Sequence, residues 1–196
     1  MISRPLASTA VFQLKATLRG SKPPIWRRFQ VPANVTLHRL HLILQVVMGW
    51  SNYHLYSFEI EGTEYGEPHP DNDFYELDFK NSRTARLSGV ARFQDLRFTY
   101  RYDFGDGWDH EIRVEKVVPA AAGTSYPVCV GGRRACPPED CGGIEGYSEL
   151  LRAVRNPRNR EHDRMMEWLG GHFDPEAFDP NRVNVALRPR ILLPPR

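Results

Sequence analysis

The chain has 196 residues, a length that favours one domain and leaves room for two small ones. Hydrophobic residues make up 41% of it and charged residues 26%, which supports a sizeable core and argues against intrinsic disorder. The formal net charge of +2 is too weak to indicate a nucleic-acid or membrane partner, and no apolar run approaches the roughly 20 residues that span a bilayer.

The N-terminal tail, residues 1–10, lacks the apolar segment of a signal peptide, so we expect a cytoplasmic protein. Apolar and polar residues then alternate over 11–18, which is the period of a half-buried strand. The stretch from Gly20 to Pro24 ends this strand, and residues 25–31 predict a second one. The two strands should form a hairpin with a long loop.

The clearest helix follows Thr36, whose hydroxyl can accept a hydrogen bond from the first helical turn. Gly49 suits the C-terminal cap. His38 and His41 lie one turn apart on the polar side; they could bind a metal, but the helix offers no acid beside them and a solvated face is favoured. The apolar stripe consists of Leu37, Leu40, Ile43, Leu44 and Val47.

Further strands are predicted after the helix. They cover residues 55–60, the short segment 63–66, and residues 97–104 and 110–118, the last two joined by Gly105-Asp106-Gly107; the acidic stretch 67–82 reads as a surface excursion. The order of hairpin, helix and further strands predicts an α+β fold with a β-grasp-like mixed sheet and one helix packed across it.

The C-terminal part changes in composition. A Cys/Pro/Gly-rich loop is followed by three short predicted helices at about 147–154, 161–169 and 180–187. The predicted organisation is an N-terminal tail (1–10), a single domain (11–187, made of sheet plus helix 11–118, loop 119–143 and helical part 144–187) and a C-terminal tail (188–196) that packs as a strap or frays.

Acids, a histidine and a tryptophan crowd into the predicted hairpin between Tyr102 and Glu111. Strand alternation places His110 on the core side, and Asp103 and Glu111 on the opposite face. Carboxylates with a histidine can hold a divalent cation or perform acid–base chemistry, and the candidate residues are Asp103, Asp106, His110, Glu139 and Asp140. Hairpin geometry alone also accounts for the glycines, so both interpretations stay open.

Three cysteines, Cys129, Cys136 and Cys141, lie within thirteen residues, a cluster that suits a reducing compartment better than a disulfide framework. Cys136 and Cys141 have the separation of one half of a zinc site, with His110, His172 or an acid as fourth ligand. The alternative is a loop that glycines and prolines order without a metal. The sequence establishes no cofactor, and zinc is the candidate that this cluster suggests.

We predict that the segment from Cys129 to Cys141 folds over the hairpin end. Trp108 would expose a large apolar surface at the hairpin tip and need cover, and the inward His110 would need a partner such as Glu139 or Asp140. The alternative is a loop that packs on the C-terminal helices.

Other common functional motifs are absent from the sequence. The Gly-Gly pairs at 131, 142 and 170 lack the context of a nucleotide-binding loop, and no serine sits in a nucleophile elbow. Several arginines are interleaved with acids, which is typical of an ordinary solvated surface rather than a phosphate-binding strip. They are Arg27, Arg28, Arg133, Arg134, Arg152, Arg155, Arg158 and Arg160.

Motifs along most of the chain resemble those of the plasmid pRiA4b ORF-3-like family. The matching stretches are Leu14-Lys15 through Pro24-Ile25-Trp26-Arg27-Arg28, Leu37-His38-Arg39-Leu40-His41 through Met48-Gly49-Trp50, His54 through Phe58-Glu59-Ile60, Tyr102 through His110, Ala135 through Asp140, Trp168-Leu169-Gly170-Gly171 and Phe173-Asp174-Pro175-Glu176. The resemblance implies an α+β domain found on plasmids, in chromosomes and beside insertion elements. Some relatives carry a resolvase label, but this sequence shows neither a recombinase-like serine motif nor a helix-turn-helix.

The leading functional hypothesis is a non-catalytic binding or adaptor module with a protein partner, linked to plasmids or mobile elements, because no complete catalytic signature is present. The rival hypothesis is a metal-dependent hydrolase that uses Asp103, Asp106 and His110, joined by Glu139 and Asp140. A DNA-associated accessory protein is a further alternative.

Overall fold

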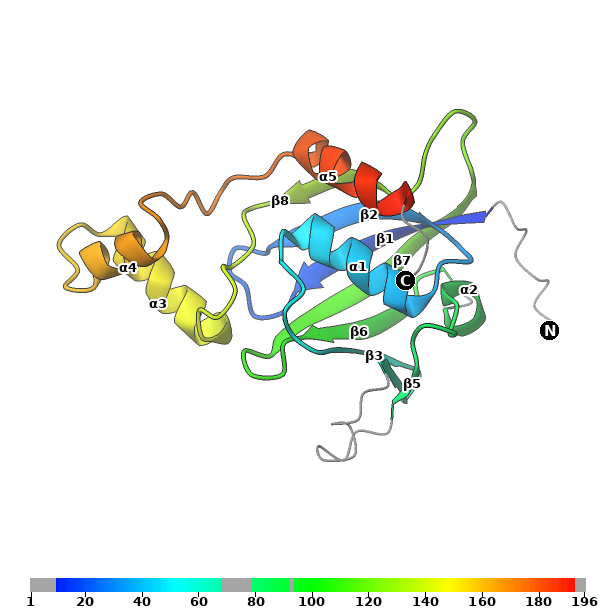
Figure 1. Ribbon diagram of the computed structural model, residues 1–196, viewed down its shortest axis with the longest axis horizontal. Coiled ribbons are helices and arrows are strands. Elements are labelled where there is room, and N and C mark those ends of the chain that lie inside the picture. The colour runs from blue at the N-terminus through cyan, green and yellow to red at the C-terminus, as the bar shows by residue number, and fades with distance from the viewer. Residues whose placement is uncertain (1–9, 68–78, 92–93, 193–196) are drawn as a thin grey trace.

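The computed structural model describes residues 10–67, 79–91 and 94–192 of the chain (Figure 1). They form a mixed sheet of eight strands in the order β5-β4-β3-β6-β7-β1-β2-β8, in which only β4 and β5 pair in parallel. The strands are β1 Ala10–Leu18, β2 Trp26–Pro32, β3 Tyr56–Ile60, β4 Thr63–Gly66, β5 Lys80–Asn81, β6 Arg97–Tyr102, β7 Trp108–Pro119 and β8 Val128–Arg133. The predicted α+β class is confirmed, whereas the β-grasp-like topology remains a prediction.

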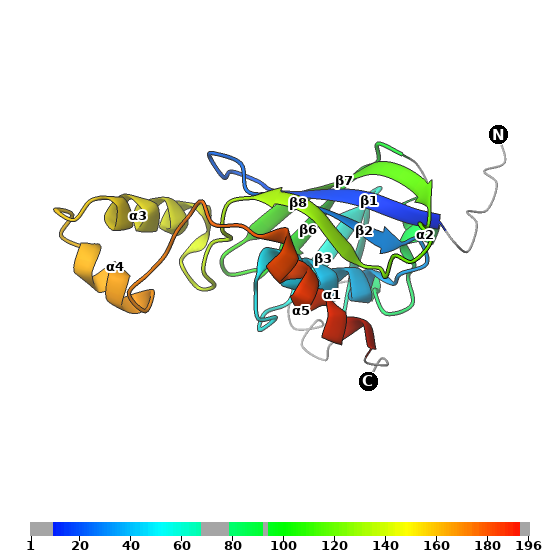
Figure 2. The ribbon, with the colours of Figure 1, turned by 90° about the horizontal axis from the view of Figure 1, so that it is seen from above.

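The helices are α1 Leu37–Met48, α2 Leu87–Val90, α3 Gly143–Arg155, α4 His162–Trp168 and α5 Pro180–Leu192. The caps of α1 are as predicted: the Thr36 side chain accepts a hydrogen bond from the Arg39 N–H, and Gly49 is left-handed with a φ of 99°. Helices α1 and α5 lie on the same face of the sheet (Figures 1 and 2). None of the helices in the described ranges is long and apolar enough to cross a membrane.

The two faces of the sheet differ in character. The face under α1 is buried and aromatic, with Phe12, Phe29, Phe58, Tyr100 and Trp108 all at 0% exposure. The opposite face carries charged side chains that pair between strands. Arg97 pairs with Glu111 and Arg101 with Asp109 across the neighbouring strands β6 and β7, and Arg28 of β2 pairs with Glu115 of β7 over the intervening β1. The sheet is therefore one-sided, and the core lies between it and the two helices.

The C-terminal part differs most from the prediction. The loop predicted at 119–143 contains β8, which pairs with β2 at the sheet edge; its two glycines had indicated a loop. Helix α5 continues to Leu192, so the tail predicted from residue 188 begins inside a helix, and its last four residues lie outside the described ranges. Most of the predicted acidic excursion, residues 68–78, lies outside them as well. Helices α3 and α4 form a pair set off from the sheet (Figure 1).

Candidate metal-binding site

Asp103 begins the turn that joins β6 to β7. Its backbone N–H donates to the Leu55 carbonyl at 2.9 Å, and its carboxylate Oδ1 accepts the Gly105 N–H at 2.9 Å. The residue is left-handed, with a φ of 55°, a conformation that aspartate adopts more readily than most residues. Strand alternation had placed Asp103 on the open face with Glu111. The left-handed turn ends that alternation, and Asp103 is only 7% exposed.

His54 lies in the segment between α1 and β3, directly before the strand that pairs with β6. Tyr56 pairs with Tyr102, and the Leu55 carbonyl accepts from Asp103. This register brings His54 to the end of the hairpin, where its Nε2 lies 3.7 Å from Asp103 Oδ2.

Asp140 lies in the segment before α3, and the neighbouring Glu139 holds this segment in place. The Tyr102 hydroxyl donates to Glu139 Oε1 at 2.5 Å, and the Ser51 N–H donates to Oε2 at 3.0 Å. The Trp50 indole donates to the Pro137 carbonyl at 3.1 Å in the same segment. Asp140 itself has a φ of 57°, and its Oδ1 lies 3.1 Å from His54 Nε2.

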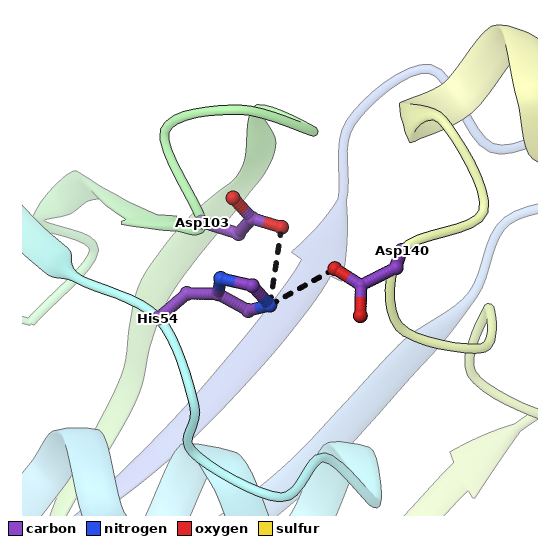
Figure 3. A group of neighbouring side chains, drawn as sticks. All are labelled: His54, Asp103 and Asp140. Carbon is purple, nitrogen blue, oxygen red and sulfur yellow. Dashed lines mark ion pairs between the residues drawn. The ribbon is translucent and has the colours of Figure 1, made fainter.

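These three side chains, from three separate segments, point toward one another (Figure 3). One ligand atom from each of His54, Asp103 and Asp140 lies within 4.8 Å of the others. Ligand atoms about 2.0–2.3 Å from one ion stand about 3–4.5 Å from each other, so the spacing suits a shared cation. Although His54 Nε2 is 3.1 Å from Asp140, the geometry is not that of a hydrogen bond, and this buried nitrogen has no such partner in the described residues.

Asp106 lies at the hairpin turn but outside this group. Its Oδ2 accepts the Gly142 N–H at 3.2 Å, which ties the turn to the start of α3. The contact is close: a Cβ on Gly143 would lie 2.4 Å from the Asp106 carbonyl oxygen, so this position requires glycine. Asp106 thus has a bridging role between the hairpin and the following segment.

His110 is on the core side, as its position in the strand predicted, and is 0% exposed. Its Nδ1 donates to the Tyr100 carbonyl at 3.3 Å, and burial lowers the pKa of the imidazole to about 4. The expected partnership with Glu139 or Asp140 is wrong, because those acids bind Tyr102 and approach His54 instead. His110 therefore stands apart from the candidate site.

Trp108, which was expected to need cover at the hairpin tip, is covered and 0% exposed. Its ring lies 5.9 Å from the Trp50 ring, which supplies the cover. Trp50 in turn bonds to Pro137, so the segment around 137–142 does reach the hairpin end, with Trp50 between it and Trp108.

The three cysteines do not gather with His110 around one point in the part of the chain that the structure describes. Cys129 is buried in β8, where its Sγ faces the Arg28 and Gly131 carbonyls, each at 3.6 Å. Burial raises the pKa of all three thiols, that of Cys141 to about 12. The zinc–thiolate hypothesis stays a prediction that this geometry does not favour.

His41 of α1 is not on a solvated face, contrary to expectation, and is 1% exposed. Its Nδ1 lies 2.8 Å from the Tyr100 hydroxyl and its Nε2 2.5 Å from Asn52 Oδ1, and its ring stacks on Tyr56. His38 is half-buried and bonds to the Tyr56 hydroxyl at 2.9 Å. Both histidines thus belong to a polar network between helix and sheet.

His54 is the member of the site that sequence reasoning missed. It stands alone before a predicted strand, away from the acidic hairpin motif and the cysteines. The available signal was the pairing of residues 55–60 with 97–104, since an antiparallel register between them brings His54 to the hairpin end.

Comparison with known proteins supports the fold and the family. The sequence matches the plasmid pRiA4b ORF-3-like protein family over residues 10–182. It is 38% identical over 179 residues to the uncharacterized protein y4hQ of Sinorhizobium fredii strain NGR234, covering 91% of each chain. The crystal structure of MM3350, a protein of unknown function from Methanosarcina mazei Go1, superposes with a TM-score of 0.79 at 38% identity, covering 88% of this chain and 96% of that one. The chain therefore belongs to the plasmid pRiA4b ORF-3-like family.

Proposed function

We propose that this protein binds a divalent cation through His54 Nε2, Asp103 Oδ2 and Asp140 Oδ1. The observation that carries the proposal is the convergence of these three atoms from separate segments within 4.8 Å. Hydrogen bonds to Leu55, Gly105 and the neighbouring Glu139 hold two of the three segments in place without using the atoms that would face the ion.

Electrostatics at the hairpin end support a cation. Asp103 is 7% exposed, and a buried carboxylate is costly unless an opposite charge compensates it. Within the described ranges, no arginine or lysine forms an ion pair with Asp103, Asp106, Glu139 or Asp140. A divalent ion would supply the missing positive charge.

The donor set narrows the choice of ion. One imidazole nitrogen with two carboxylate oxygens suits Zn²⁺, Mn²⁺ or Fe²⁺ better than Ca²⁺, which prefers oxygen ligands alone. Three protein ligands would leave a coordination position for water or a ligand. The Asp140 side chain is 67% exposed, so that position is reached from solvent.

Metal binding can be measured by titrating Zn²⁺ and Mn²⁺ into chelator-treated protein in a calorimeter. We expect about one equivalent to bind, with affinity at least tenfold weaker in Asp140→Asn and His54→Gln, since each loses a ligand. Asp95→Asn removes another exposed carboxylate, which pairs with Arg113, and serves as the matched control. Equal affinity in Asp140→Asn and the control would contradict the proposal.

Metal-assisted hydrolysis is a second candidate, in which His54 replaces His110 as the histidine of the site. The observation that favours it is two exposed aromatic side chains, Tyr53 at 79% and Phe104 at 38%, each adjacent in the chain to a proposed ligand. A bound ion would lower the pKa of its water. Zn²⁺- or Mn²⁺-loaded protein should hydrolyse p-nitrophenyl esters or phosphates faster than Asp140→Asn; equal rates would remove this candidate.

A binding or adaptor role toward a protein partner also remains a proposal. The observation that favours it is Trp168, which is 50% exposed on α4 in the helical pair set off from the sheet (Figure 1). Exposed tryptophans are common anchors of protein interfaces. Trp168→Ala should reduce the recovery of a partner from cell extract relative to the unaltered protein, and undiminished recovery would exclude this surface.

A further inference from the structure

A groove of about 410 Å³ opens between the C-terminal end of α1 and the N-terminal end of α5, a volume that suits a small organic molecule. It is separate from the residues of the candidate metal site. Its walls are mostly apolar and include Arg27, Val46, Met48, Ala177, Phe178 and Val183.

Arg27 contributes the one deeply buried charge of this groove. It extends from β2, is 2% exposed, and uses its Nε and Nη1 hydrogens for backbone carbonyls. Nε donates to Val47 at 2.7 Å, and Nη1 donates to Trp26 and Arg133 at 3.0 Å each. Nη2 makes no hydrogen bond among the described residues. It is also absent from the unpaired polar atoms of these residues that are fully enclosed by protein. Nη2 is therefore not fully enclosed, and Arg27 is one of the residues that line the groove.

The charge of Arg27 has no acidic partner: the guanidinium forms no ion pair in the described part of the chain. Its flat face lies 4.3 Å from the Phe178 ring. Gly132 makes that stacking possible, because a Cβ there would come within 2.5 Å of Phe178. Arg27 is thus held by three hydrogen bonds and by the Phe178 ring, and Nη2 is left as an unused donor.

Asp179, the acidic residue that lines the groove, already has polar partners. Asp179 caps α5 by accepting the Asn181 N–H at 2.8 Å, and its other oxygen lies 4.0 Å from the exposed Arg182 guanidinium. The N-terminal end of α5, which carries partial positive charge, faces the same space. The local balance therefore favours an added negative charge beside Arg27.

We propose that this groove binds a small-molecule carboxylic acid with an apolar body. The carboxylate would accept from Arg27 Nη2, and the apolar part would lie along Val46, Met48 and Val183. A single buried guanidinium among apolar walls selects one negative charge with an apolar chain rather than a polyanion.

Octanoate is a suitable probe, with octanol as its uncharged counterpart, and EDTA keeps the carboxylate from binding through a metal. Calorimetry or ¹⁵N NMR titration should show saturable octanoate binding at least tenfold tighter than octanol. A peptide with a free C-terminal carboxylate is the third ligand, and tighter binding of this peptide than of octanoate would overturn the small-molecule assignment.

Two variants test the site itself. Ala177→Phe fills the groove from an exposed position and should weaken octanoate binding at least tenfold while leaving the thermal midpoint within a few degrees. Arg27→Lys keeps the charge but removes the Nη2 donor, and should reduce the preference for octanoate over octanol. Equal binding of octanoate and octanol, absence of saturable binding, or unchanged affinity in Ala177→Phe would each overturn the proposal.

Discussion

Two histidine-bearing regions, the core under α1 and the end of the β6–β7 hairpin, differ in what surrounds the imidazole. His41 and His110 are in the core, at 1% and 0% exposure, where His41 bonds to the Tyr100 hydroxyl and His110 Nδ1 to the Tyr100 carbonyl. His54 stands at the hairpin end, 30% exposed in its side chain and facing two carboxylates. The core region fixes the fold, whereas the hairpin end brings a histidine and two carboxylates to face one another.

This difference shows why residue type alone does not identify a site. A buried histidine with a lowered pKa stays neutral near pH 7 and contributes packing and one hydrogen bond. A cation that binds all three side chains would stabilise a histidine that lies beside one buried and one exposed carboxylate. Substitutions in the core should therefore change stability, and those at the hairpin end should change metal binding.

Trp108→Ala should give the largest loss of stability. The side chain is fully buried beneath Trp50, and removing a buried tryptophan costs about 3–5 kcal/mol. Urea unfolding followed by circular dichroism measures the loss. Trp168→Ala, at a side chain that is 50% exposed, is the matched control and should cost less than about 1 kcal/mol. Similar losses for the two tryptophans would mean that the hairpin is not the core of the fold.

His110 should make stability depend on pH. Burial lowers its pKa from 6.5 to about 4, so between these values the unfolded chain binds more protons than the folded one. The stability that the neutral imidazole contributes is thus present above pH 6.5 and is lost as the pH falls toward 4, by about 3 kcal/mol. The difference in unfolding free energy between pH 7 and pH 4 should be smaller by that amount in His110→Leu. His172→Gln, at an exposed position, should keep the original pH dependence.

Local signals predicted the parts of the fold that depend on neighbouring residues. The caps of α1 and the inward side of His110 followed from Thr36, Gly49 and strand alternation. Strand β8 could not be predicted from its own residues. Its Gly132 leaves room for the Phe178 ring, which comes from a distant segment of the chain.

The candidate site was predicted only in part, because it also depends on contacts between distant segments of the chain. Asp103 and Asp140 were among the candidates, but His54 joins them only through the pairing of β3 with β6. Likewise, Arg27 and Arg134 were assigned to a solvated surface, yet both are 2% exposed. Their burial follows from helix and strand packing that a pattern of alternating charges does not reveal.

Glu139→Gln should have the smallest effect on stability and still alter the site. The Tyr102 hydroxyl can donate to the amide oxygen, but the Ser51 N–H would then face an N–H₂ group, so one of two hydrogen bonds is lost. We expect a cost of about 1 kcal/mol in the free energy of unfolding. Because Glu139 positions the adjacent Asp140, we also expect metal affinity to fall about tenfold, as for other groups that orient ligands. Glu149→Gln, on the exposed side of α3, is the matched control for both measurements. Unchanged metal affinity in Glu139→Gln, with Asp140→Asn still defective, would show that other contacts of the segment place Asp140, such as those of Pro137 with Trp50 and Gly142 with Asp106.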